Sequence, residues 1–497
     1  MRPTAVAALL LLFLPAPAAN LFAQTAQAAQ AERSVTISGK EIGYRASPGT
    51  ITLERDNGRA RGSIFYTAYH RTGLAPDQLA QRPIAFVFNG GPGSSSAWLH
   101  LGAFGPRRLV LGEAGLTEAD HPYRTVANQH SLIDVADLVF IDPIGTGFSR
   151  ATDIVAARGF YSFRSDVRSI AEFIKLYMAR EQRLNSPCCL IGESYGAMRA
   201  CGLVPELEAG HGIVVNGIVL VSGPIVMGKR VPPDQLLPTA AATAHFHGLL
   251  NPDLQALGRQ ELLERVGGFV DNAYRPALGE QGVDPESRDR VAAEVRAFTG
   301  LRRLRGLSFS LREVRVNACR ELGVESIGIY DARVTSNARG GRFRGATGDP
   351  ALALIREPMT AVMGDYLTRD LGYQTDLDYE LLKRIPMWSH SGSKASDTLT
   401  RALQTNRGLK TMVACGYYDT VTPMAVVRRA VEDAEFTPAQ RKNISFKNYE
   451  GGHMMYTNLP SLKQLSADVR AFIRKSSLRK RGPALVPTAS TPASTSL

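Results

Sequence analysis

The chain has 497 residues, of which 44% are hydrophobic and 21% charged, and its formal net charge is +12. This composition is typical of a globular protein and excludes a fibrous or wholly disordered chain. The length suits one large domain with an insertion, or two domains, and it allows a core that needs no metal or disulfide to hold it together.

The N-terminus has the pattern of a signal peptide. Arg2 supplies a positive charge, and the apolar run from Ala5 to Leu14 has the length of a secretory hydrophobic region. That run is shorter than the roughly 18 apolar residues of a membrane-spanning helix, and no later stretch reaches that length. We therefore predict that residues 1–28 are a signal peptide and that the protein is exported, periplasmic or secreted, with no membrane span after cleavage. The alternative is that the apolar run stays as a membrane anchor.

Residues 34–223 show strand patterns that alternate with helix patterns. Two antiparallel strands are expected over residues 51–71, and one helix with an apolar stripe is expected over residues 162–180. Runs that are apolar on both faces, typical of central strands, occupy residues 84–88, 138–142, 188–191 and 218–221. Strands alternating with helices predict an α/β fold with a mostly parallel sheet flanked by helices.

The pattern changes over residues 224–400, where helical segments dominate, and strand patterns return at 411–415 and 444–446. We expect 224–400 to be a mainly helical cap inserted into one α/β domain, whose two parts are residues 34–223 and 401–475. Residues 476–497 are basic and rich in Ser, Thr and Pro, and we expect them to form a disordered tail.

The positive charge and the cysteines indicate little about function. A basic surface could attract anionic polymers, but a solvated face with a basic tail is the simpler interpretation, and no motif predicts a nucleic-acid partner. The chain has only five cysteines, an odd number, and this low content does not fit a disulfide framework. Cys188, Cys189 and Cys415 lie in apolar runs, where buried free thiols are expected.

The most informative motif is Gly192-Glu193-Ser194-Tyr195-Gly196, a G-x-S-x-G sequence between an expected strand and an expected helix. That context is the one a nucleophile elbow requires, because a sharp strand-to-helix turn leaves the serine hydroxyl exposed above the sheet. The helix N-terminus behind the serine favours developing negative charge. Ser194 is therefore the candidate nucleophile.

A glycine-rich turn, Asn89-Gly90-Gly91-Pro92-Gly93, directly follows the expected strand 84–88. Such a turn can direct a backbone N–H at the oxygen of a tetrahedral intermediate, and the N–H of Tyr195 would be the second donor. An ordinary Gly/Pro turn is the alternative interpretation of this motif when it is taken alone.

A hydroxyl nucleophile needs a base, and the base needs a carboxylate that orients it. Asp419 and His453 each come just after an expected strand, and they follow Ser194 in the order typical of this kind of site. No HExxH motif or Cys/His cluster is present, so we expect no metal and no cofactor.

Taken together, these segments resemble the motifs of the serine carboxypeptidase family, and of its bacterial-type members in particular. The resembling segments occur in the family's order and span nearly the whole mature chain; they are residues 89–96, 142–149, 192–196, 416–419 and 452–456. The resemblance implies an α/β-hydrolase fold and a serine-type carboxypeptidase that acts on peptides with a free C-terminus.

The resemblance also implies a role for individual residues. It implies a Ser194, Asp419 and His453 triad, with the N–H groups of Gly91 and Tyr195 as the oxyanion hole. It further implies that Asn89 and Glu193 bind the terminal carboxylate of the substrate. Glu193 would have to be protonated to bind a carboxylate, which favours acidic pH.

Three positions depart from the family's pattern. Val87 stands where the family often has Trp, Ser94 where it often has Cys, and Ala103 where it usually has a second carboxylate-binding Glu. The absence of that Glu keeps an esterase or acyltransferase on the same triad as an alternative. A non-catalytic envelope-binding protein built on this fold is an alternative of another class, against which the intact triad argues.

Overall fold

The computed structural model describes residues 31–223, 231–279, 284–304, 306–337, 348–389 and 395–478. The expected signal peptide lies outside the described residues, as does residue 479 onward in the expected tail. The last helix, α16, includes Ser476 and Ser477, so the expected tail begins as helix.

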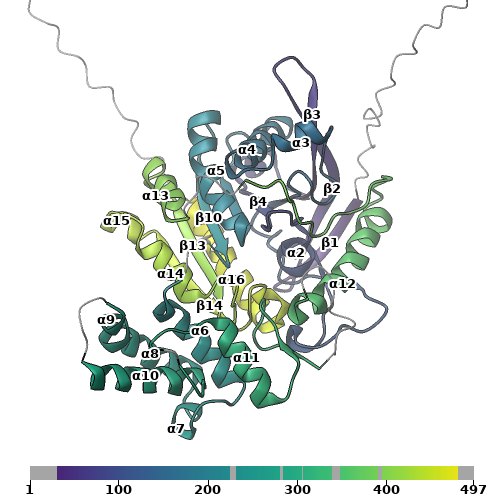
Figure 1. Cartoon of the computed structure of the whole chain (residues 1–497). Coiled ribbons are helices and arrows are strands. Elements are labelled where there is room, and N and C mark those ends of the chain that lie inside the picture. The colour runs from purple at the N-terminus through teal and green to yellow at the C-terminus, as the bar shows by residue number, and fades with distance from the viewer. Residues whose placement is uncertain are drawn as a thin grey trace, which may run out of the picture.

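A ten-stranded sheet forms the centre of the described chain (Figure 1). Its strand order is β1-β2-β3-β7-β4-β9-β10-β13-β14, and β8 pairs with β3. The strands are β1 (Ala31–Ile37), β2 (Lys40–Glu54), β3 (Ala60–Arg71), β4 (Ile84–Phe88), β7 (Asp137–Ile141), β8 (Arg150–Ala151), β9 (Cys188–Glu193), β10 (Val215–Val221), β13 (Lys410–Gly416) and β14 (Ile444–Tyr449). Two further pairs lie outside this sheet: β5 (Arg107–Leu109) with β6 (Thr125–Ala127), and β11 (Ser326–Ile327) with β12 (Thr335–Ser336).

The sheet is antiparallel from β1 to β7 and parallel from β7 to β14. Every residue of β4, β7 and β9 is buried, which is why their sequences are apolar at consecutive positions rather than at alternate ones. Parallel strands direct their carboxyl ends to one edge, so the loops after β4, β9, β13 and β14 meet there.

Helices cover both faces of the sheet. One face packs against apolar residues of α4, α5, α13 and α14, and the other against residues of α2, α12 and α16 and the π-helix η1. The helices are α1 (Pro76–Gln81), α2 (Ala97–Leu99), α3 (Ile154–Arg158), α4 (Phe163–Arg180), α5 (Tyr195–His211), α6 (Pro233–Phe246), α7 (Pro252–Gln255), α8 (Arg259–Phe269), α9 (Arg275–Leu278), α10 (Pro285–Thr299), α11 (Leu311–Leu322), α12 (Pro350–Asp365), α13 (Ala395–Thr405), α14 (Met424–Glu432), α15 (Pro438–Arg441) and α16 (Leu459–Ser477). Short π or 3-10 turns are η1 (His100–Phe104), η2 (Glu113–Gly115), η3 (Val270–Tyr274), η4 (Tyr366–Asp370) and η5 (Met455–Thr457).

Helices α6 to α11 gather at one end of the molecule, in teal and green in Figure 1. They share a hydrophobic core of their own, which includes Leu237, Leu262, Val295 and Val314. This group lies within the segment expected to be a helical cap. The division of the chain into cap and α/β domain stays a prediction.

The expected α/β fold is confirmed, and the expected strands and the 162–180 helix lie where the patterns placed them, with shifts at their ends. The helix begins at Phe163 because Ser162 is its cap: the Ser162 side chain accepts a hydrogen bond from the Ser165 N–H. All five cysteines are free thiols, and Cys188, Cys189 and Cys415 are buried.

Candidate active site

Ser194 lies in a sharp turn between β9 and α5. Its backbone angles are φ 59° and ψ −125°, a conformation that L-residues rarely adopt and that is found where a scaffold holds a functional group in place. The Ser194 N–H donates to the Val221 carbonyl at 2.8 Å, which fixes the turn to the end of β10. A side chain at Gly196 would come within 2.9 Å of the carbonyl oxygens of Phe88 and Asn89, so the motif's second glycine is required for close packing.

His453 and Asp419 form a buried pair on the loops that follow β14 and β13. His453 Nδ1 lies 2.8 Å from Asp419 Oδ2, and the two residues are 3% and 0% exposed. The Asp419 carboxylate also accepts hydrogen bonds from the N–H groups of Val421 and Thr422 and from the Thr422 hydroxyl. These donors hold the carboxylate in place and keep it available to His453.

The electrostatics of the pair suit a general base. Burial lowers the pKa of His453, but the charge of Asp419 and its hydrogen bond act in the opposite direction, and the net effect is a raised pKa. The carboxylate of Asp419 thus favours the protonated form of His453.

The His453 loop is attached both to the sheet and to the segment that follows α11. Ser222, directly after β10, donates its hydroxyl to the His453 carbonyl at 2.7 Å. Since Ser194 is fixed to Val221, the end of β10 supports both the turn that carries Ser194 and the loop that carries His453. On the other side, the His453 N–H donates to the Tyr330 carbonyl at 2.6 Å, and the Tyr330 ring packs edge-on against the imidazole.

The glycine-rich turn after β4 lies against the nucleophile turn. A side chain at Gly90 would come within 2.5 Å of the Tyr195 nitrogen, so only glycine permits this approach. Gly91 has φ +97°, which also favours glycine. Arg199 of α5, which forms a buried ion pair with Asp166, donates to the Asn89 carbonyl at 2.6 Å and holds the turn in place. The two expected oxyanion-hole residues, Gly91 and Tyr195, are therefore on adjoining segments.

Asn89 and Glu193 are both buried beside this junction. Asn89 accepts a hydrogen bond from the Leu99 N–H through Oδ1, at 3.1 Å. Burial raises the pKa of Glu193 to about 7, although the charge of His453 and the side chains of Tyr456 and Asn89 act to lower it. A carboxyl with that pKa is protonated in mildly acidic solution and can donate a hydrogen bond there.

The three departures from the family's pattern are all buried. Val87 lies inside β4, and Ser94 accepts a hydrogen bond from the Trp98 indole at 2.8 Å. Ala103 lies in η1 and is 0% exposed.

The sequence predictions missed three side chains at this site: Thr422, Tyr330 and Tyr456. Thr422 follows Asp419 by three positions, a spacing typical of side-chain-capped turns, so a local signal existed. Tyr330 reaches His453 only through tertiary packing, and nothing in its own neighbourhood of the sequence indicates that. Tyr456 is in the His453 motif, but Glu193, beside which it lies, is far away in the chain.

A serine at a strained strand-to-helix turn, followed along the chain by an Asp and a His on loops after parallel strands, defines the α/β-hydrolase class. A solved prohormone-processing carboxypeptidase from Saccharomyces cerevisiae has the same fold: it matches with a TM-score of 0.52 and 16% identity over 87% of this chain and 91% of the other. The sequence model of the serine carboxypeptidase family matches residues 49–253. The resemblance that the motifs predict is thus confirmed over this part of the chain.

Two curated relatives agree with that match. Serine carboxypeptidase-like 9 from Arabidopsis thaliana is 28% identical over 151 residues, which are 30% of this chain and 33% of the relative. The pheromone-processing carboxypeptidase KEX1 from Yarrowia lipolytica is 28% identical over 171 residues, which are 33% of this chain and 26% of the relative. The matched part thus spans about a third or less of each relative's length.

Proposed function

We propose that the protein is an exported serine carboxypeptidase that removes residues from the free C-terminus of peptides. The observation that carries this proposal is the buried pair of His453 and Asp419, with 2.8 Å between Nδ1 and Oδ2, attached to the same strand end as Ser194. The family match over residues 49–253 supports it.

The proposed reaction follows from the roles of these groups. His453 takes the proton from Ser194, and the oxygen of Ser194 attacks the carbonyl carbon of the last peptide bond. The N–H groups of Gly91 and Tyr195 stabilise the negative oxygen of the tetrahedral intermediate. His453 then gives its proton to the leaving amine, and water, activated by His453, hydrolyses the acyl-enzyme and restores Ser194.

Selection of the chain end would come from Asn89 and Glu193. Both are buried next to the glycine-rich turn, and a protonated Glu193 can donate to a carboxylate rather than repel it. A substrate with a free carboxylate would therefore place its last peptide bond beside Ser194.

Export rests on the signal-peptide pattern of residues 1–28. Within the described ranges no helix has both the length and the apolar character that crossing a membrane requires. Cell fractionation of the full chain, with N-terminal sequencing of the mature form, tests this part of the proposal.

The peptidase proposal is tested with two matched peptides, one with a free C-terminal carboxylate and one with a C-terminal amide. Mass spectrometry of the products should show stepwise loss of C-terminal residues from the acid and much slower loss from the amide. Internal cleavage, or equal rates on the two peptides, would contradict it.

An esterase or acyltransferase on the same triad is the second candidate, and the observation that favours it is the buried Ala103 in place of a carboxylate-binding Glu. Hydrolysis of neutral esters together with inertness toward peptide acids would support that candidate. A protein that no serine-directed fluorophosphonate labels would instead be the non-catalytic binding protein.

A further inference from the structure

Tyr456 lies beside Glu193, and although it ends the segment that carries His453, neither the sequence pattern nor the resemblance gives it a role. It is in η5, three residues after His453, and is 3% exposed. Its ring packs against Gly102: a side chain built at Gly102 would come within 2.8 Å of Cε2 of the ring. The ring therefore occupies the space that a larger residue at position 102 would need, directly before Ala103.

Three buried polar side chains meet here, close enough to affect one another but without a well-aligned hydrogen bond among them. The side chains of Tyr456 and Asn89 are close enough to lower the pKa of Glu193, against the larger effect of burial. Yet, among the residues that the structure describes, Asn89 Nδ2, Glu193 Oε2 and the Tyr456 hydroxyl have no hydrogen-bond partner of acceptable geometry. Buried polar atoms are normally paired with protein, ordered water or a ligand, so three unpaired atoms from three separate segments form a polar site that suits a hydrogen-bonding ligand group.

The chemistry of the three groups limits which class of ligand can bind to them. The Asn89 amide and the Tyr456 hydroxyl carry donors, and Glu193 carries one when it is protonated. Burial, with further contributions from Glu193, raises the pKa of Tyr456 well above its ordinary value, so the hydroxyl keeps its proton across the working pH range. A ligand that faces three donors must offer several acceptor lone pairs, as a carboxylate does.

We propose that Tyr456 is a substrate-binding residue whose hydroxyl donates to the terminal carboxylate of the peptide, together with Asn89 and protonated Glu193. This inference rests on the proposed function, since the carboxylate is that of a peptide end held beside Ser194. The Tyr456 hydroxyl would supply a donor to the carboxylate. Ala103, at the position where the resembled family usually has a second carboxylate-binding Glu, cannot supply one.

Binding to an inactive variant tests Tyr456 without catalysis. In a Ser194→Ala background, calorimetry compares an N-blocked dipeptide acid with its C-terminal amide. Adding Tyr456→Phe should raise Kd for the acid by about 10- to 100-fold, the size expected for one hydrogen bond to a charged group, and leave Kd for the amide within about twofold. The matched control is Tyr177→Phe, which removes another buried hydroxyl, that of Tyr177 in α4, which bonds to His70 of β3.

Thermal unfolding separates binding from a structural role. The Tyr456 hydroxyl makes no well-aligned hydrogen bond in the described part of the unliganded protein, so Tyr456→Phe should lower Tm less than Tyr177→Phe, which loses a formed hydrogen bond. Gly102→Ala provides a second variant, because it keeps the hydroxyl but displaces the ring, and it should also weaken binding of the acid selectively.

Equal weakening of acid and amide, no change in either, or no preference of the background protein for the acid would overturn the role of Tyr456. The proposed function can be refuted independently of the role of Tyr456. If the wild-type protein cleaves no peptide but the acid-selective loss in Tyr456→Phe is found, the carboxylate site stands and the peptidase activity does not. If peptide acids are cleaved and Tyr456→Phe binds them normally, only the role of Tyr456 is lost.

Discussion

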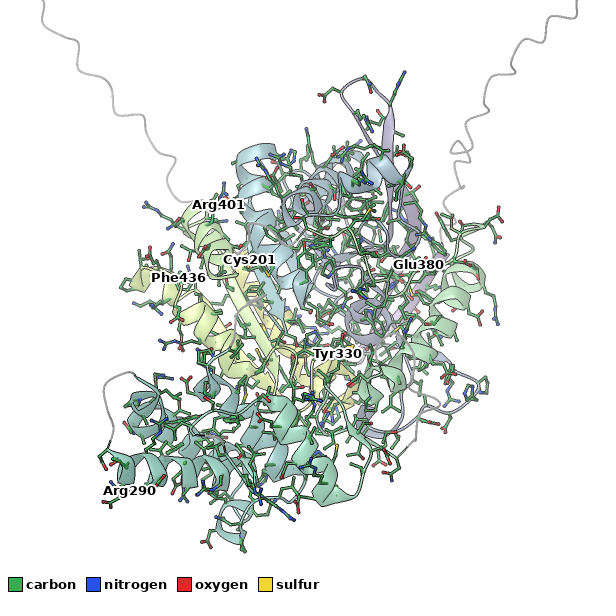
Figure 2. All side chains as sticks on the ribbon, viewed as in Figure 1. Cys201, Arg290, Tyr330, Glu380, Arg401 and Phe436 are labelled. Atoms are coloured by element: carbon green, nitrogen blue, oxygen red, sulfur yellow. The ribbon has the colours of Figure 1, made fainter. Side chains whose placement is uncertain are left out.

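The main-chain N–H of His453 donates to the carbonyl oxygen of Tyr330 at 2.6 Å, so a residue from the segment after α11 holds the loop of the candidate base. Figure 2 shows Tyr330 near the middle of the molecule, between the α6–α11 helices and the sheet. The neighbouring residues attach to the other loop: the Ala332 N–H donates to the Tyr418 carbonyl, and the Thr420 hydroxyl donates to the Ile329 carbonyl. Residues 329–332 thus connect the loops that carry Asp419 and His453.

Glu450 reinforces this connection, and its removal should reduce both stability and turnover. It forms ion pairs with Arg333, whose side chain is 2% exposed, and with Arg259 of α8. We expect Glu450→Ala to lower the free energy of unfolding by about 1–3 kcal/mol, because charged hydrogen bonds are lost. Since the His453 loop would loosen, kcat should also fall.

Urea unfolding and steady-state kinetics measure these two effects. Glu432→Ala is the matched control, because that glutamate pairs with Arg428 on an exposed helix surface, where a change within about 0.5 kcal/mol is expected. If Glu450→Ala and Glu432→Ala behave alike, the link between the α6–α11 helices and the site is energetically unimportant.

Ser194→Ala should remove hydrolysis and fluorophosphonate labelling while the fold survives. The loss in kcat is expected to be on the order of 10⁴-fold or more, because the members of a triad act as a unit. Circular dichroism checks the fold, and mass spectrometry of the labelled protein locates the probe. A label found on another serine of the variant would refute Ser194 as the nucleophile.

Asp419→Asn should reduce kcat by about 10⁴-fold, the size of the effect in a serine protease with the same triad, because an amide favours the wrong tautomer of His453. Two other acids serve as comparisons. Asp142 accepts hydrogen bonds from Ser96, and Glu450 is held by arginines, so neither carboxylate is bonded to His453. Glu450→Gln should therefore cost far less turnover than Asp419→Asn, and the reverse order would reassign the acid.

The sequence predicts those parts of this site that depend on local patterns. Fully apolar runs predict β4, β7 and β9, because strands covered on both faces have no polar side. The G-x-S-x-G context predicts Ser194, and the order along the chain leads to Asp419 and His453. The positions of Tyr330 and Tyr456 beside the site could not be predicted, because each depends on a contact between segments that are distant in the sequence and that only the packed structure brings together.

The pH dependence of activity should differ between peptide acids and amides because of Glu193. Its pKa is raised to about 7, so it is protonated below that pH and donates to a carboxylate, and it becomes charged above that pH and repels one. The kcat/KM for peptide acids should therefore fall as pH rises through about 7, with a slope that approaches tenfold per pH unit. The kcat/KM for amides or neutral esters should not show this fall. His453 must be neutral to act as a base, and since its pKa is raised, both substrates should lose activity on the acidic side.

Glu193→Gln isolates this effect, because a glutamine amide donates a hydrogen bond at every pH and never carries a charge. The variant should lose the basic limb for peptide acids and exceed the wild type on them at about pH 8.5, where a group with a pKa of about 7 is mostly ionised. The acidic limb, which belongs to His453, should remain in both proteins. Profiles of kcat/KM from about pH 4 to about pH 9 on the matched acid and amide test this directly, over a range that brackets the shifted carboxyl. A basic limb that appears equally for both substrates, or that persists in Glu193→Gln, would mean that another group titrates and that Glu193 does not bind the carboxylate.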